Sequence, residues 1–91
     1  MGRKLNDDTK KISIKIFDYL SSSKNPRSTK EIHEYLRRHF DEKIEYSKVY
    51  QTLKHLKRKR FIYQENRGRT SYWGIIEGVD REQVLEEMNL S

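Results

Sequence analysis

The spacing of the apolar side chains changes near residue 60 of this 91-residue chain, and that change most strongly limits the possible folds. Before it, apolar residues recur every three to four positions, as on one side of an α-helix. From residue 61 to 75, β-forming residues flank a glycine-containing turn, as in a pair of strands. A chain this short forms one small domain. The order therefore predicts an α+β domain, with helices first and a β-hairpin after them.

Three helices are predicted ahead of the hairpin, over about residues 7–22, 28–40 and 47–60. At the start of the second, Ser28 and Glu31 fit a capping box, in which each side chain bonds a free backbone N–H of the other. Ser47 is the predicted N-cap of the third helix, because serine accepts a hydrogen bond from the first helical turn. Each helix has an apolar stripe that can face a shared core.

The third predicted helix has a narrow apolar stripe and a broad polar side. Val49, Leu53 and Leu56 form the stripe. A projection at about 100° per residue places four polar side chains most directly opposite this stripe, and three others beside them. The four are Ser47, Gln51, Lys54 and Arg58, and the three that flank them are Lys48, Tyr50 and His55.

The predicted hairpin has strands at 61–65 and 70–75, joined by a turn at 66–69 in which Gly68 can take a positive φ. Tyr72 and Trp73 are adjacent on the second strand, so only one of them can face the core. A second capping pair, Asp80 with Gln83, predicts a short acidic helix over about 80–89.

Basic and acidic residues are concentrated in different segments. Residues 27–69 contain 13 Lys or Arg and six Asp or Glu, a net charge of +7. Residues 70–91 contain one basic and five acidic residues, a net charge of −4. This separation favours a surface that binds a polyanion and a separate end that does not. Charge alone is also compatible with a soluble surface that binds nothing.

The order of elements resembles a winged helix-turn-helix domain over about residues 9–76. Residues 28–36 look like the second helix of that family, and residues 47–56 look like its recognition helix. Residues 59–62, Lys-Arg-Phe-Ile, resemble the exit into the wing, where Lys-Gly-Leu-Ile is common, so Arg60 stands where glycine often sits. The composition and small size also resemble archaeal and archaeal-virus transcriptional regulators.

The resemblance implies that the third helix lies in the DNA major groove and that the wing reaches the backbone or minor groove. Gln51 is the candidate base reader, because an amide can bond adenine through two hydrogen bonds. The N-terminus of the second helix suits a phosphate. The implied DNA-binding residues are Ser28, Thr29, Lys30, Ser47, Lys48, Tyr50, Gln51, Lys54, His55, Arg58, Arg67 and Arg69.

The expected function is sequence-specific binding of double-stranded DNA by a homodimeric transcriptional regulator. The alternative is a winged helix that serves as a protein-interaction module in a larger complex, and RNA binding is a weaker third option. The dimer interface is predicted from spare apolar faces on the first and last helices, although these residues can also pack within one chain. They are Ile14, Phe17, Val84, Leu85 and Met88.

Several other classes of function lack their usual residues. The absence of cysteine excludes disulfides, thiolate metal sites and cysteine nucleophiles. The three histidines do not share a helix face, and neither a P-loop nor a nucleophile elbow occurs. We therefore expect no enzyme, metal, cofactor, small-molecule ligand or membrane span. The expected location is the cytoplasm, on the nucleoid if the protein is cellular.

Overall fold

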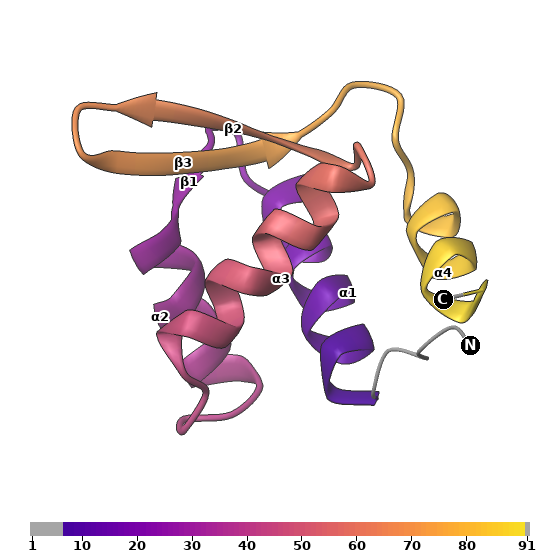
Figure 1. Cartoon of the computed structure of the whole chain (residues 1–91), viewed down its shortest axis with the longest axis horizontal. Coiled ribbons are helices and arrows are strands. Elements are labelled where there is room, and N and C mark those ends of the chain that lie inside the picture. Colours follow the sequence, from indigo (N-terminus) through magenta and orange to yellow (C-terminus); the bar gives the residue numbers. More distant parts are fainter. Residues whose placement is uncertain (1–6, 91) are drawn as a thin grey trace.

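The computed structural model describes residues 7–90 and the side chains of residues 8–88. Within this range the chain forms four helices and a three-stranded antiparallel sheet, as the α+β prediction requires (Figure 1). Among the described helices, none combines the length and apolar character needed to cross a membrane. In chain order the elements are α1 (Asp7–Ser21), β1 (Arg27–Ser28), α2 (Thr29–His39), α3 (Tyr46–Arg58), β2 (Ile62–Arg67), β3 (Thr70–Ile75) and α4 (Arg81–Leu90).

Both predicted capping boxes form. At α2, the Glu31 N–H donates to Ser28 Oγ at 3.1 Å, and the Ser28 N–H donates to Glu31 Oε1 at 2.9 Å. At α4, the Asp80 N–H donates to Gln83 Oε1 at 2.8 Å, and the Gln83 N–H donates to Asp80 Oδ1 at 3.0 Å. Each box satisfies two backbone donors that the first helical turn leaves free, which fixes where each helix begins.

The start of α3 differs from the prediction. The helix begins at Tyr46, and its N-cap is Glu45, whose side chain makes no capping hydrogen bond. The Glu45 carbonyl accepts from the N–H groups of Lys48 and Val49 at 3.1 and 3.2 Å. The first turn is therefore closed by backbone hydrogen bonds ahead of Ser47, which lies inside the helix and is not its cap.

The end of α3 is a Schellman motif built on an arginine. The helix ends at Arg58, two residues earlier than predicted. The Arg60 N–H donates to the Lys57 carbonyl at 2.9 Å, and the Phe61 N–H donates to the Leu56 carbonyl at 3.1 Å. Arg60 has φ +65°, the left-handed conformation that favours glycine at this position. The chain therefore keeps the turn that the winged-helix resemblance implies, but at a cost in backbone energy.

We expect Arg60→Gly to stabilise the fold by about 0.5–1 kcal/mol. A left-handed L-residue costs about 1–2 kcal/mol, and the greater unfolded-state entropy of glycine offsets part of the gain. Urea denaturation of Arg60→Gly and of Arg60→Ala measures the difference. The alanine variant removes the same charge but keeps the Cβ, so it should show no gain. If the two variants were equally stable, the left-handed backbone conformation of Arg60 would not be the cause of the change in stability.

The sheet order is β1–β3–β2, with β3 in the centre. The two residues of β1 were not predicted as a strand, because two residues are too few to show a periodic pattern; Arg27 pairs with Trp73 and Ser28 with Tyr72. In the wing, Arg67 pairs with Thr70, so the loop contains only Gly68 and Arg69. Strand β3 thus has the predicted bounds, whereas β2 ends two residues later than predicted and the turn is shorter.

Trp73 joins the wing to the helical core. It is completely buried, and its Nε1–H donates to Thr29 Oγ1 at 2.8 Å across the junction of β3 and α2. Tyr72, its neighbour on β3, is half-buried, so one of the two rings faces the core, as predicted. The buried apolar residues are Ile12, Ile16, Phe17, Leu20, Ile32, Leu36, Ile44, Val49, Leu53, Leu56, Ile62, Trp73, Val84 and Met88.

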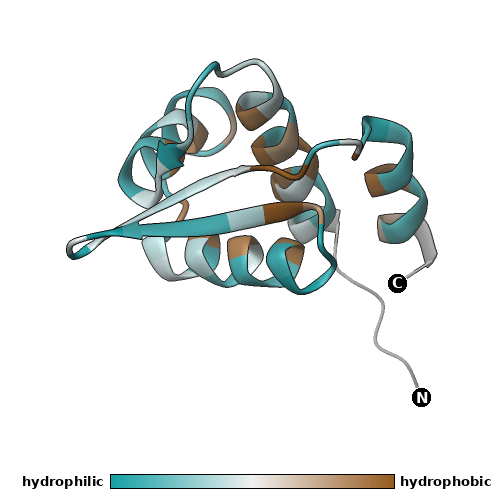
Figure 2. Cartoon of the chain, turned by 90° about the horizontal axis from the view of Figure 1, so that it is seen from above, coloured by the Kyte–Doolittle hydropathy of each residue, from teal (hydrophilic) through white to brown (hydrophobic). Residues whose placement is uncertain are grey.

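The predicted dimer interface is wrong for Phe17, Val84 and Met88, which are at most 4% exposed within one chain. The reason is that α4 packs on α1, which an ion pair of 3.0 Å between Arg81 and Asp18 supports. Figure 2 shows the hydrophobic residues of α4 on the side turned toward the rest of the domain. An apolar helix face shows that it needs a partner, but its sequence does not show that the partner is in the same chain.

Candidate nucleic-acid interface

The outer side of α3 is polar, and its inner side is completely buried. Val49, Leu53 and Leu56 have no exposed surface. The four residues predicted to lie opposite this stripe, Ser47, Gln51, Lys54 and Arg58, are all exposed. The side chains of this outer side therefore project from the domain, and none of them has to support the core.

A groove of about 410 Å³ lies between the N-terminus of α2, the first half of α3 and the wing. Lys30 and Arg69 contribute cations to it from opposite elements, so regions that are about 40 residues apart in sequence meet at one surface. The groove thus combines two cations with side chains that can donate hydrogen bonds. Such a surface suits a phosphate backbone. The lining residues are Ser28, Thr29, Lys30, Tyr46, Tyr50, Arg69, Thr70, Ser71 and Tyr72.

Four exposed cations on this side take no part in the described ion pairs. Lys30 and Arg69 lie in the groove, whereas Lys54 and Arg58 lie on the outer side of α3. By contrast, Lys59 pairs with Glu87 of α4 at 2.7 Å. The acidic helix α4 lies at the end of the domain opposite the tip of the wing (Figure 1). The positive charge of the groove and α3 is therefore separated from the acidic end.

The two wing arginines have different surroundings. Arg67 Nε donates to Glu65 Oε2 at 2.7 Å, and its guanidinium lies 4.8 Å from the centre of the Tyr72 ring. The hydrogen bond to Glu65 raises the pKa of Arg67. Arg69 is exposed in the two-residue loop, outside the described ion pairs and cation–π contacts. Arg69 is therefore the wing arginine with no competing partner in the part of the chain that the structure describes.

Tyr50 connects the groove to the core. Its ring meets the Trp73 ring edge-on, with 6.1 Å between the ring centres. Lys54 Nζ lies 5.8 Å from the centre of the Tyr50 ring, a distance that allows a cation–π contact. The Tyr50 ring thus packs against the buried Trp73 and also lines the groove. On its other contact, it lies next to the cation of Lys54.

Three predicted contacts have roles inside the domain. The Ser28 hydroxyl accepts the capping hydrogen bond of α2. Thr29 is 4% exposed, and its hydroxyl accepts from Trp73, so its side chain belongs to the core although the residue lines the groove. Lys48 Nζ donates to Thr9 Oγ1 at 2.7 Å and is thereby directed to α1. Of the residues predicted at the α2 N-terminus, Lys30 has an exposed side chain.

His55 is also directed into the domain. Its Nε2 is buried and has no hydrogen-bond partner among the described residues. Burial lowers the pKa of His55, the positive charges of Lys59 and Arg58 lower it further, and Glu87 of α4 opposes them. The His55 ring is therefore partly buried, with Nε2 inside the domain, and its contact with DNA stays a prediction. A helical projection gives the direction of a side chain but not the neighbour that covers it.

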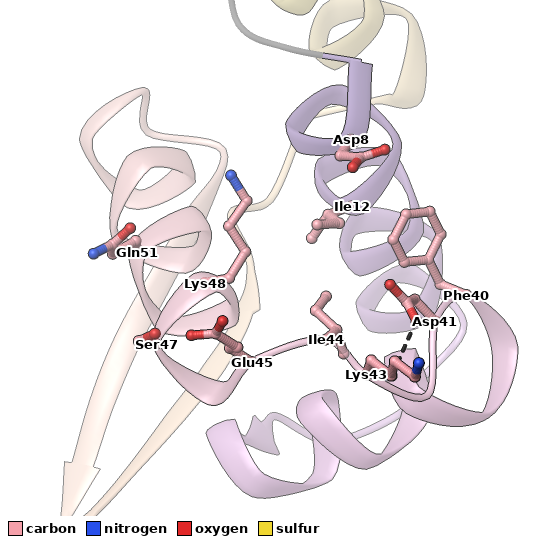
Figure 3. A pocket seen from close by; sticks show the side chains of 10 residues that line it. All are labelled: Asp8, Ile12, Phe40, Asp41, Lys43, Ile44, Glu45, Ser47, Lys48 and Gln51. Atoms are coloured by element: carbon pink, nitrogen blue, oxygen red, sulfur yellow. Dashed lines mark hydrogen bonds between the residues drawn. The ribbon is translucent and has the colours of Figure 1, made fainter.

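A second hollow, of about 340 Å³, lies between α1 and the start of α3 (Figure 3). Ile12, Phe40 and Ile44 line it, and Lys48 points into it, whereas Gln51 points away from it (Figure 3). Asp41 accepts a hydrogen bond of 2.9 Å from the Lys43 N–H within the α2–α3 loop. Within residues 7–90, no group of three His, Cys, Asp or Glu residues is placed to hold a metal ion.

Among solved structures, the chain is similar to the Helicobacter pylori ferric uptake regulator Fur, a protein with three functional metal-binding sites. The TM-score is 0.66 at 19% sequence identity, and the match covers 94% of this chain and 67% of that one. This likeness establishes the winged helix-turn-helix fold. It gives no support to the predicted resemblance to archaeal and archaeal-virus regulators. No protein-family model and no curated protein matches the sequence.

Tyr46 is a groove residue that the sequence did not indicate. It is the first residue of α3, is 50% exposed and lines the groove together with Lys30. A helix that starts at Ser47, as the capping pattern predicts, leaves Tyr46 in a loop. The start of α3, which is closed by backbone hydrogen bonds, is needed to place Tyr46 on this helix.

Proposed function

We propose that this protein is a transcriptional regulator that binds specific sequences of double-stranded DNA. In this proposal α3 lies in the major groove, and the wing contacts the backbone or the minor groove. The observation that carries the proposal is the groove in which the N-terminus of α2, the start of α3 and the tip of the wing meet. Lys30 and Arg69 supply cations there, next to the exposed cations of α3.

The residues divide into those that position the protein and those that read sequence. Lys30 and Arg69 bind backbone phosphates from the groove that they share, because contacts of this kind fix the register without reading bases. Gln51, which points out from the middle of α3, contacts a base edge, for which adenine suits its amide best. Lys54 and Arg58 bind phosphate or guanine from the later turns of the helix.

The alternative, a protein-interaction module, predicts a different outer side of α3. Buried protein interfaces are depleted in charged residues at their centre and enriched in aromatic and other apolar residues. Here the outer side presents Ser47, Gln51, Lys54 and Arg58. This composition supports DNA over a protein partner at that surface.

We expect Arg69→Ala to weaken duplex binding more than Arg67→Ala does. Loss of one phosphate contact lowers affinity by about threefold to tenfold and makes the salt dependence shallower by about one counterion. Arg67 already bonds Glu65, so its removal changes little at the DNA. Titration of each variant against one duplex at several salt concentrations makes the comparison. Equal losses, or a larger loss for Arg67→Ala, would contradict the assignment of Arg69.

The direct test of DNA binding is an anisotropy titration of the full chain with a labelled duplex. If the protein makes roughly six phosphate contacts, a rise in salt from 50 to 200 mM should lower its affinity for the duplex by about a thousandfold. Steep salt dependence together with preference for a selected sequence over a random one is the expected result. Absence of binding at 50 mM salt would exclude the proposal.

The homodimer remains a proposal with less support than the sequence suggested. Ile14 and Leu85 are the predicted interface residues that stay partly exposed. A dimeric helix-turn-helix protein reads two half-sites about one helical turn apart, since each recognition helix enters one major groove. Two repeated half-sites in the bound sequences support a dimer, and a single short motif supports a monomer.

A further inference from the structure

We propose that Tyr46 reads sequence by packing its ring against the C5-methyl group of a thymine at the edge of the major groove. This inference rests on the proposed function and adds an apolar contact to an interface that is otherwise polar and basic. Nothing in the sequence pattern pointed to this residue, since it precedes the predicted start of the helix.

Tyr46 is one of two large hydrophobic side chains that are exposed in the described range. At 50% exposed, it exceeds Tyr63, the other large hydrophobic side chain that is clearly exposed in the described range, at 38%. Tyr46 belongs neither to the buried core nor to the partly buried side chains that pack against it, so its ring does not stabilise the core. A half-exposed aromatic ring in a cation-lined groove has unused apolar surface that a ligand can cover.

The position of Tyr46 suits contact with a base. It is the first residue of α3, and the N-terminal residues of recognition helices reach base edges. The cations that line the same groove, Lys30 and Arg69, come from α2 and the wing and suit backbone phosphates next to that base. Thymine is the base that presents a methyl group in the major groove.

The orientation of the ring is fixed by its neighbours. The Tyr46 and His33 rings meet edge-on at 90°, with 5.5 Å between their centres. His33 Nε2 lies 2.8 Å from the Ile44 carbonyl oxygen, which can only accept, so this nitrogen donates. His33 is thereby held to the turn that leads into α3, and it acts as a positioning residue for Tyr46. A tyrosine held in this way loses little side-chain freedom on binding.

The test uses uracil, which differs from thymine only by lacking the methyl group. In a duplex recovered by selection from a random pool, each thymine is replaced in turn by uracil. At one position per half-site, we expect the wild-type affinity to fall about fourfold, the effect of exposing one methyl-sized group. Tyr46→Ala should bind the thymine duplex about fourfold more weakly than wild type and show no further loss with uracil.

Three further variants test whether the aromatic ring of Tyr46 is the group that contacts the methyl. Tyr46→Phe should keep the preference for thymine, because it keeps the ring and loses only the hydroxyl. His33→Ala should reduce the preference while leaving the salt dependence unchanged. Tyr63→Ala, on β2 and outside the groove, is the matched tyrosine control and should keep the preference.

Two sets of results would overturn the proposal while leaving DNA binding intact. One is a wild-type protein that is indifferent to uracil at every position, or a selected site without thymine. The other is a loss for Tyr46→Phe as large as that for Tyr46→Ala, which would assign the hydroxyl to a phosphate. Failure of the wild type to bind any duplex would instead remove the proposed function itself.

Discussion

Charge reversal of Lys54 and Arg58 together is expected to weaken duplex binding by about a hundredfold or more near 100 mM salt. In the proposed complex each of these cations makes one phosphate or base contact. A carboxylate in its place repels the DNA. The salt dependence should become shallower by about two counterions, one for each lost contact. Anisotropy titrations of Lys54→Glu with Arg58→Glu over a range of salt concentrations measure both effects.

The matched control for this pair is Lys11→Glu with Lys15→Glu on α1. The two lysines have the same spacing of four residues on a helix, and neither lines the groove. The net charge changes by the same amount in both double variants, so a general loss of positive charge affects them equally. If both pairs lose affinity to the same extent, or the Lys54 and Arg58 pair loses none, α3 is not the recognition helix.

Trp73→Ala should cost about 3–5 kcal/mol of the free energy of unfolding, the usual range for removal of a large buried aromatic side chain. Small domains have about 5–15 kcal/mol in total, so the variant should be close to unfolding at 37 °C. The loss has two parts. The ring leaves a cavity at the junction of β3 with α2, and its hydrogen bond to Thr29 disappears. The wing should therefore lose its attachment to the helices.

Tyr72→Ala is the control for this variant, because Tyr72 is the neighbour of Trp73 on β3 and is half-buried. Its loss should be at most about 1 kcal/mol, as for most substitutions at the surface. Denaturation followed by circular dichroism compares the two variants, since Trp73 is the single tryptophan of the chain and its fluorescence is lost in one of them. A larger effect at Tyr72 would contradict the packing described for the sheet.

The elements that the sequence predicted well have local causes. Ser28 with Glu31 and Asp80 with Gln83 each place two reciprocal hydrogen bonds within four residues, so the starts of α2 and α4 can be read directly from the chain. Alternation on β3 required that one ring of Tyr72 and Trp73 be buried, although it did not say which. Local chemistry fixed these features without any help from distant contacts.

The features that the sequence did not predict depend on distant contacts. The strand β1 exists because Arg27 and Ser28 pair with β3, about 45 residues further along the chain. Thr29 lies on a polar side of α2, yet its hydroxyl accepts from Trp73 of β3, and on α3 the Nε2 of His55 is buried inside the domain. Phe17 was predicted to lie on an apolar face without a partner in the chain, but α4 packs on α1. In each case, the sequence pattern indicates the direction of a side chain, whereas its neighbours depend on the tertiary structure.

In the proposed function, α3 and the wing of this chain read the sequence of double-stranded DNA. Selection of bound duplexes from a random pool tests it most directly, with the double variant of Lys54 and Arg58 carried in parallel. We predict that the wild type enriches a recurrent motif containing thymine and that the double variant enriches none. A wild-type pool that stays random through successive rounds, or the same motif recovered by both proteins, would contradict this claim.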